Sequence, residues 1–199
     1  MEYFAATWAL LTILVVSTNF VPFVAAQDAV LDIDGRPLSS GNKYYISPVT
    51  GGGVGLRMRN NTCPMYVVYT KNGLPAVFTP YSSGRGGVIK EGADLKVETS
   101  AVTVCVQSTR WRVHRDSKLD KYFVYTGDDS SSSSSIDLDY FRFDKSESGD
   151  DYVMVYCPSV CEFCRPYCGT LGSYSDEHGN GWLVIGEQAN ALKVQFRKA

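Results

Sequence analysis

Six cysteines constrain the fold of this chain more than any other feature, because four of them lie within one short stretch. They are Cys63, Cys105, Cys157, Cys161, Cys164 and Cys168. An even number of cysteines is typical of a secreted domain that disulfides hold together. Six cysteines permit 15 pairings, so the residues alone leave the connectivity open.

Two other chemistries also use closely spaced cysteines. Four thiolates can bind one zinc ion, and Cys161-x-x-Cys164 has the spacing of a redox pair. No histidine lies close to the cluster, and no βαβ pattern of the thioredoxin type surrounds it. We therefore expect disulfides here, and neither a bound metal nor another cofactor.

The N-terminal 26 residues have the pattern of a secretory signal peptide. Residues 8–16 are apolar except for Thr12, residues 20–24 are mostly apolar, and the small residues Ala25 and Ala26 follow. The alternative is a membrane anchor, but Pro22 and the polar residues before it interrupt the run that a spanning helix needs. We expect cleavage after Ala26, which leaves residues 27–199 as a single domain without a membrane anchor. The product is expected outside the cell or in the vacuole.

Charge and composition argue against several classes of function. The 19 Lys and Arg residues nearly balance the 21 Asp and Glu residues, which gives no basic surface for nucleic acid. The two histidines, His114 and His178, do not accompany a nucleophile motif. Asp176-Glu177-His178 could be interpreted as metal ligands. These residues lie in a predicted hairpin turn, however, where polar side chains are expected in solvent. The sequence therefore predicts a protein that is not an enzyme.

Short runs with alternating apolar residues predict β-strands throughout the mature chain. One such run contains Val102, Val104 and Val106, and another contains Leu192, Val194 and Phe196. Runs rich in Tyr, Phe and Val at residues 44–46, 65–69, 122–125, 140–143 and 152–156 add further strands. Residues 94–98 and 191–195 resemble each other, which hints at an internal repeat. An all-β barrel or sandwich follows from this pattern.

Several motifs in order resemble the plant Kunitz-type inhibitors of the soybean trypsin inhibitor superfamily. The strongest is Val30-Leu31-Asp32-Ile33-Asp34-Gly35-Arg36-Pro37-Leu38, which looks like the N-terminal signature of that family. Further matches are Tyr44-Tyr45-Ile46, Cys63-Pro64, Gly73-Leu74-Pro75, Leu95-Lys96-Val97, Trp111-Arg112-Val113, Tyr156-Cys157-Pro158, Cys168-Gly169 and Leu192-Lys193-Val194-Gln195-Phe196. The spacing Cys157-x₃-Cys161-x₂-Cys164-x₃-Cys168 resembles the miraculin-like subgroup.

This resemblance implies a disulfide-stapled β-trefoil over residues 27–199. The family fold has twelve strands in three pseudo-repeats, with six strands in a short barrel and six in a hairpin cap. The family pairing applied to this sequence gives Cys63–Cys105, Cys157–Cys168 and a nested Cys161–Cys164.

The resemblance also assigns a reactive-site loop and a residue that supports it. The loop consists of Ser83, Gly84, Arg85, Gly86 and Gly87. Counting back from Ile89 places Arg85 at the primary specificity position, with Arg85–Gly86 as the scissile bond. Family inhibitors usually carry an asparagine at the position of Ser40, where its side chain props the loop from within. Serine has a shorter side chain than asparagine. In the loop itself, the glycines around Arg85 permit many backbone conformations.

Two functions are compatible with these residues. The first is a secreted inhibitor whose partner is a trypsin-like serine protease, because Arg85 can pair with the carboxylate in the S1 pocket of such an enzyme. The alternative is a non-inhibitory miraculin-like protein of storage, defence or stress on the same fold. Asn60-Asn61-Thr62 is an N-glycosylation sequon. The even cysteine count leaves no thiol for an interchain bridge, which favours a monomer.

Overall fold

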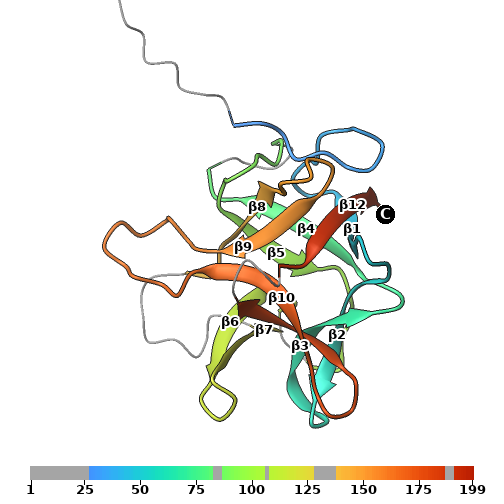
Figure 1. The fold of residues 1–199 in the computed structure, drawn as a ribbon, viewed down its shortest axis with the longest axis vertical. Helices are drawn as coiled ribbons and strands as arrows, with labels where there is room; N and C mark the ends of the chain where they lie inside the picture. The colour runs from blue at the N-terminus through green and yellow to red at the C-terminus, as the bar shows by residue number, and fades with distance from the viewer. Residues whose placement is uncertain (1–26, 83–86, 106–107, 128–137, 187–190) are drawn as a thin grey trace, which may run out of the picture.

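The computed structural model describes residues 27–82, 87–105, 108–127, 138–186 and 191–199. These residues form twelve strands and no helix (Figure 1). No helical segment in the described part of the chain is long and apolar enough to cross a membrane. The strands are β1 (Lys43–Pro48), β2 (Gly53–Arg59), β3 (Thr62–Thr70), β4 (Pro75–Pro80), β5 (Leu95–Thr99), β6 (Trp111–Asp116), β7 (Lys121–Thr126), β8 (Phe141–Lys145), β9 (Tyr152–Tyr156), β10 (Gly169–Ser175), β11 (Gly181–Gly186) and β12 (Lys193–Lys198).

Six of these strands close into a barrel. They are hydrogen-bonded in the order β12-β1-β4-β5-β8-β9, and β9 pairs with β12 to complete the ring. The other six form the hairpins β2–β3, β6–β7 and β10–β11. One strand of each hairpin pairs with one strand of each other hairpin, through β3–β7, β3–β11 and β7–β11. The chain therefore repeats the unit barrel strand, hairpin, barrel strand three times, which is the expected β-trefoil.

Three phenylalanine rings fill the centre of the barrel, one from the last strand of each repeat. Phe78, Phe143 and Phe196 have no exposed surface. Their ring centroids are 5.0 Å apart for Phe78 and Phe143, 5.6 Å for Phe78 and Phe196, and 4.7 Å for Phe143 and Phe196. The first two pairs meet edge to face, the arrangement that the quadrupoles of aromatic rings favour. We call these three residues the phenylalanine triad.

The alternating pattern predicted most strands correctly but failed at residues 102–105, while Val106 of the same run lies outside the described residues. Val102 is fully exposed, Val104 is mostly exposed, and residues 101–105 belong to no strand. The ladder beside β5 skips this stretch, because the Thr99 N–H donates to the Thr109 carbonyl and Glu98 pairs with Arg110. Without a neighbouring strand, an alternating segment has no partner for its backbone groups.

The fold repeats internally, but residues 94–98 and 191–195 do not occupy equivalent places in it. Residues 95–99 form β5, the first strand of the second repeat, whereas 193–198 form β12, the last strand of the third. The strands that occupy equivalent places are β4, β8 and β12, and each of them contributes one ring to the triad.

Three disulfides form, and their pairing is the one that the family resemblance implied. Cys63–Cys105 joins β3 to the loop after β5, with Cα atoms 5.7 Å apart. Cys157–Cys168 joins the end of β9 to the start of β10, and Cys161–Cys164 lies inside that loop. All six cysteines are therefore used within the chain.

The triad predicts a large loss of stability when one ring is removed. Phe143→Ala should lower the free energy of unfolding by about 3–5 kcal/mol, because the removed ring leaves a cavity that its two neighbours cannot fill. Phe163→Ala is the matched control, since Phe163 is 95% exposed. Denaturant unfolding with the disulfides intact measures both. A loss below about 1 kcal/mol for Phe143→Ala would contradict the role given to the triad.

The disulfides differ in the length of chain that they close, which predicts unequal contributions. Replacing Cys63 and Cys105 by serine should lower the free energy of unfolding by about 3–4 kcal/mol, since the loop spans 42 residues. Replacing Cys161 and Cys164 should cost about 2 kcal/mol or less, because they are only three residues apart. Thermal unfolding of the two double variants tests the order, and a larger loss for the nested bridge would refute it.

Candidate functional site

The candidate reactive-site loop lies mostly outside the described residues. Of the five residues assigned to it, Ser83, Gly84, Arg85 and Gly86 are not described, and Gly87 is. What the structure establishes is how the chain enters this segment at Ser82 and leaves it at Gly87. The described part of the site consists of the two flanks of this segment.

The entering flank is held by the barrel. Pro80, the last residue of β4, pairs with Leu95 of β5, and the next residue continues the ladder because the Tyr81 N–H donates to the Asp94 carbonyl at 2.8 Å. The Tyr81 ring meets the Tyr140 ring edge to face, with centroids 5.4 Å apart. Tyr81 itself is mostly exposed. The backbone direction at the start of the segment is therefore fixed two residues before Ser83.

The leaving flank is held by the N-terminal part of the chain. The Ser40 N–H donates to the Gly87 carbonyl at 2.8 Å, and the Ile89 N–H donates to the Leu38 carbonyl at 2.8 Å. Between these bonds, Ser39 and Val88 form an antiparallel bridge. Leu38 and Ile89 are fully buried, while Val88 points toward solvent. This alternation is the period-two pattern of a strand with one face on the core.

Ser40 lies where the resemblance placed the supporting residue. It is 7% exposed, and its backbone bonds directly to Gly87, the first described residue after the segment. The neighbouring Gly41 N–H faces the Phe78 carbonyl on β4 at 3.4 Å. The backbone of Ser40 therefore holds the chain where it leaves the segment.

Asp94 is a residue of this region that the sequence reasoning missed. Its carbonyl accepts from Tyr81, and its Oδ2 accepts from the backbone N–H and the hydroxyl of Ser159 at 2.9 and 2.6 Å. Ser159 belongs to the loop closed by Cys157–Cys168. The sequence offered no signal for this contact, because 65 residues separate the two side chains.

The sequon lies at the other end of the molecule. Asn60 and Asn61 form the two-residue turn of the β2–β3 hairpin, with φ of 55° and 53°, the left-handed values that a type I′ turn requires. Both are exposed. In Figure 1 this hairpin points to the lower end of the view, whereas residues 27–42 lie at the upper end. Asn60 borders an open cleft of about 780 Å³ that Trp182 and Asp176 also line.

Asp176 organises the β10–β11 turn. Its carboxylate accepts from the side-chain amide of Asn180, the backbone N–H groups of Asn180 and His178, and the indole N–H of Trp182. These bonds, above all that from the Asn180 amide, hold the pKa of Asp176 well below its usual value. The predicted hairpin turn is present, and Gly179 has a φ of 76° in it, in the left-handed region. Every partner of Asp176 belongs to its own hairpin, which indicates a structural role.

A second carboxylate at this end has an equally structural environment. Asp116 Oδ2 lies 2.8 Å from Arg59 Nη1, and this hydrogen bond lowers the pKa of Asp116. The guanidinium of Arg59 also lies over the Phe123 ring, 4.5 Å from its centroid. The pair ties the β2–β3 hairpin to the β6–β7 hairpin.

Comparison with known proteins gives one consistent family. The profile of the Kunitz legume family, described as trypsin and protease inhibitor, matches residues 30–198. Kunitz type trypsin inhibitor 111 of Medicago truncatula is 32% identical over 194 residues, which cover 94% of this chain and 92% of that protein. Miraculin of Synsepalum dulcificum is 32% identical over 191 residues, covering 86% of each.

The similar proteins are not all named for the same target. The alpha-amylase/subtilisin inhibitor of Oryza sativa is 31% identical over 185 residues, covering 88% of this chain and 86% of that protein. Among solved structures, a Kunitz type trypsin inhibitor from Cicer arietinum superposes with a TM-score of 0.72 at 30% identity, covering 86% of this chain and 99% of that one.

Proposed function

The chain belongs to the Kunitz legume family of trypsin and protease inhibitors, and from this premise we propose that it inhibits a trypsin-like serine protease through Arg85. The similar proteins named above as inhibitors are not enzymes, which supports a binding function. The observation that carries the proposal is the anchoring of both flanks of residues 83–86. Tyr81 is bonded to Asp94, and Gly87 is bonded to Ser40.

Such anchoring is what an inhibitor of this kind needs. A segment with fixed ends binds a protease at a smaller entropic cost than a free peptide does. The guanidinium of Arg85 would form a bidentate ion pair with the carboxylate at the base of the S1 pocket. If the protease cut the Arg85–Gly86 bond, the bonds at Tyr81 and Gly87 would keep the two new ends in place, which favours resealing over release.

The N-terminal segment and the cysteines supply the setting of this function. We propose that residues 1–26 direct the chain into the secretory pathway and are removed, and that the product acts as a monomer outside the cell or in the vacuole. Disulfides persist in that oxidising route. The three intrachain disulfides fit this setting.

A non-inhibitory protein on the same fold is the second candidate. Gly84, Gly86 and Gly87 surround Arg85, and glycine widens the range of backbone conformations that binding must restrict. Serine rather than asparagine at position 40 also shortens the support. The titration below separates the two candidates, since the second predicts no loss of trypsin activity.

Inhibition should depend on the charge at position 85. Titrating bovine trypsin with the oxidised protein should remove activity stoichiometrically, and Arg85→Ala should weaken inhibition at least about a hundredfold, as expected for a central charged anchor. Arg85→Lys is the matched control, because it keeps the positive charge. Unfolding curves that match the parent show that the fold is intact. Equal inhibition by Arg85→Ala and the parent would disprove the assignment.

We also propose that Asn60 carries an N-linked glycan. The protein secreted by plant cells should lose mass on treatment with a peptide N-glycanase, and Asn60→Gln should abolish that shift. Asn61→Gln is the control, since it leaves the sequon intact. Inhibition of trypsin should be the same with and without the glycan, because the β2–β3 turn lies at the far end of the molecule from residues 27–42 (Figure 1). An unshifted parent protein would reject the site.

A further inference from the structure

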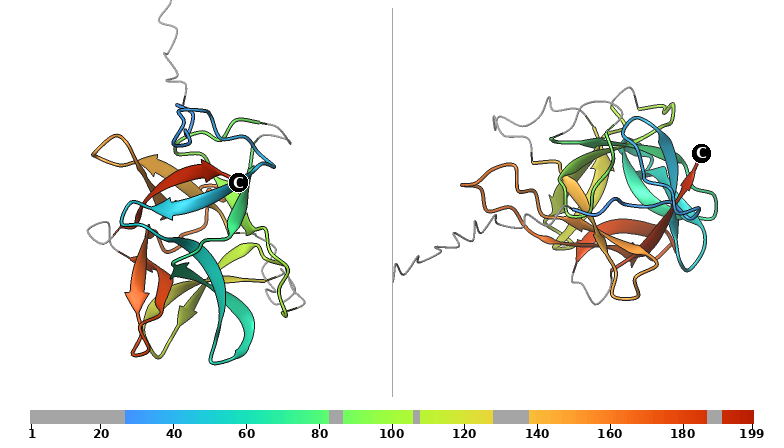
Figure 2. Two further views of the ribbon diagram at one scale, coloured as in Figure 1. Left: turned by 90° about the vertical axis from the view of Figure 1, so that its right-hand side faces the viewer. Right: turned by 90° about the horizontal axis from the view of Figure 1, so that it is seen from above.

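The side chain of Phe163 is exposed on a turn that a disulfide closes. Phe163 is 95% exposed. It lies between Cys161 and Cys164, whose disulfide closes a four-residue turn, and the Cys164 N–H faces the Cys161 carbonyl at 3.3 Å. Figures 1 and 2 show the loop between β9 and β10 projecting outward in two perpendicular views. An exposed aromatic ring can bury its apolar surface only against a partner molecule.

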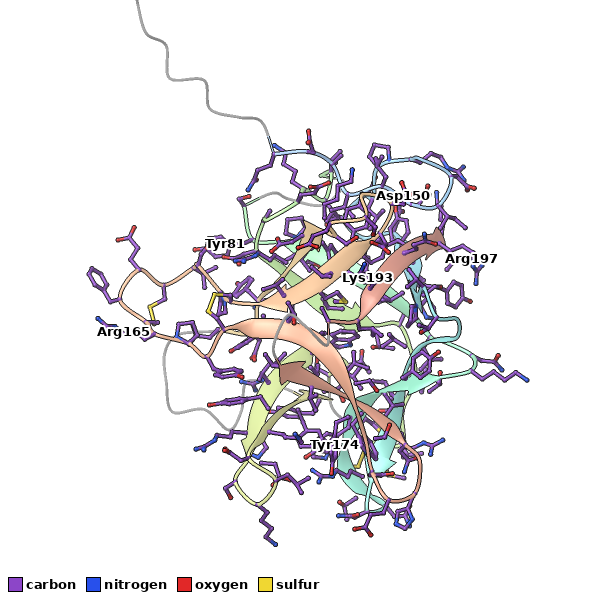
Figure 3. All side chains as sticks on the ribbon, in the orientation of Figure 1. Tyr81, Asp150, Arg165, Tyr174, Lys193 and Arg197 are labelled. Atoms are coloured by element: carbon purple, nitrogen blue, oxygen red, sulfur yellow. A yellow bond between two sulfur atoms is a disulfide. The ribbon has the colours of Figure 1, made fainter. Side chains whose placement is uncertain are left out.

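The nested disulfide contributes little to global stability, so its main effect is local. A bridge between residues three apart removes little entropy from the unfolded chain. It does, however, hold the backbone of Glu162 and Phe163 in one turn. Glu162 and Arg165, on either side of the ring, are also exposed. Figure 3 shows Arg165 at the outer part of this loop.

Both arms of the loop are fixed to the body. On the entering arm, Ser159 donates two hydrogen bonds to the Asp94 carboxylate. On the returning arm, the Tyr167 ring stacks on Tyr122 of β7, with centroids 4.1 Å apart and planes 7° from parallel. The outer disulfide Cys157–Cys168 closes the base. The tip is therefore presented rigidly, which lowers the entropic cost of binding.

The base of this loop adjoins the base of the reactive-site segment. Asp94 bonds to Ser159 through its side chain and to Tyr81 through its backbone. A single residue thus joins the start of the segment that carries Arg85 to the arm that carries Phe163. Figure 3 shows Tyr81 on the body of the molecule and Arg165 on the projecting loop.

We propose that Phe163 is a second contact for the protease that binds at Arg85, an inference that rests on the proposed function. Phe163 does not enter the catalytic cleft, because residues 161–164 form a tight turn, whereas serine proteases bind extended segments. It packs instead into an apolar depression on the protease surface beside that cleft. Glu162 and Arg165 lie at the solvent-exposed rim of this contact, where charges add more to specificity than to affinity.

The test is a comparison of dissociation rates from immobilised bovine trypsin. Phe163→Ala should dissociate about tenfold faster than the parent while inhibition stays stoichiometric, since the loss of an aromatic anchor acts mainly on the dissociation rate. Leu119→Ala is the matched control. Leu119 is also an exposed apolar residue, but it lies in the turn between β6 and β7, at the hairpin end. It should dissociate like the parent.

A second variant tests the rigidity of the turn. Replacing Cys161 and Cys164 by serine keeps Phe163 but releases the turn, and it should reproduce part of the faster dissociation. Parent-like dissociation of both Phe163→Ala and the double serine variant, with Arg85→Ala inactive, would overturn this inference and leave the proposed function intact. A folded parent that fails to inhibit trypsin would overturn both. Loss of inhibition in Phe163→Ala alone, with Arg85→Ala fully active, would also overturn both, because Phe163 would then be the primary anchor.

Discussion

The contact among Phe78, Phe143 and Phe196 is the interaction on which the rest of the structure depends. Each ring comes from the closing strand of one repeat, and each is fully buried. Their mutual contacts hold β4, β8 and β12 at fixed separations around the barrel axis. The flanks of the candidate site are attached to these strands or to their neighbours, since Pro80 ends β4 and the Gly41 N–H faces the Phe78 carbonyl. The position of the site therefore follows from aromatic packing at the centre.

The sequence predicted the fold well because several independent signals agreed. The alternating runs located most strands, and the family motifs specified the β-trefoil and the disulfide pairing. The failures have physical causes. Val102 and Val104 alternate with polar residues, yet no strand runs beside them, and pairing cannot be deduced from one segment. The three-fold repeat followed from the family resemblance and not from matching segments, because the repeats share packing positions such as the triad rather than a recognisable string of residues.

The candidate site could be predicted only in part. The resemblance assigned Ser40 as a side-chain support, and the structure adds a backbone hydrogen bond from Ser40 to Gly87 that no sequence pattern indicates. Asp94 was missed, because its importance lies in contacts to Tyr81 and Ser159 that only the fold creates. Arg85 remains an assignment by resemblance, since it lies outside the described residues. The fold fixes the ends of its segment, and the same fold in similar proteins accompanies different named targets, among them trypsin, alpha-amylase and subtilisin.

The support of the leaving flank connects the two ends of the chain. Residues 38–40 bond to residues 87–89, and the same N-terminal segment bonds to the last strand, because the Ile33 N–H donates to the Phe196 carbonyl at 2.9 Å. Strand β1 also pairs along its length with β12. During synthesis, the ribosome makes the N-terminal segment long before its partner strand β12. A chain that stops before β12 therefore lacks the strand to which β1 and the N-terminal segment are bonded.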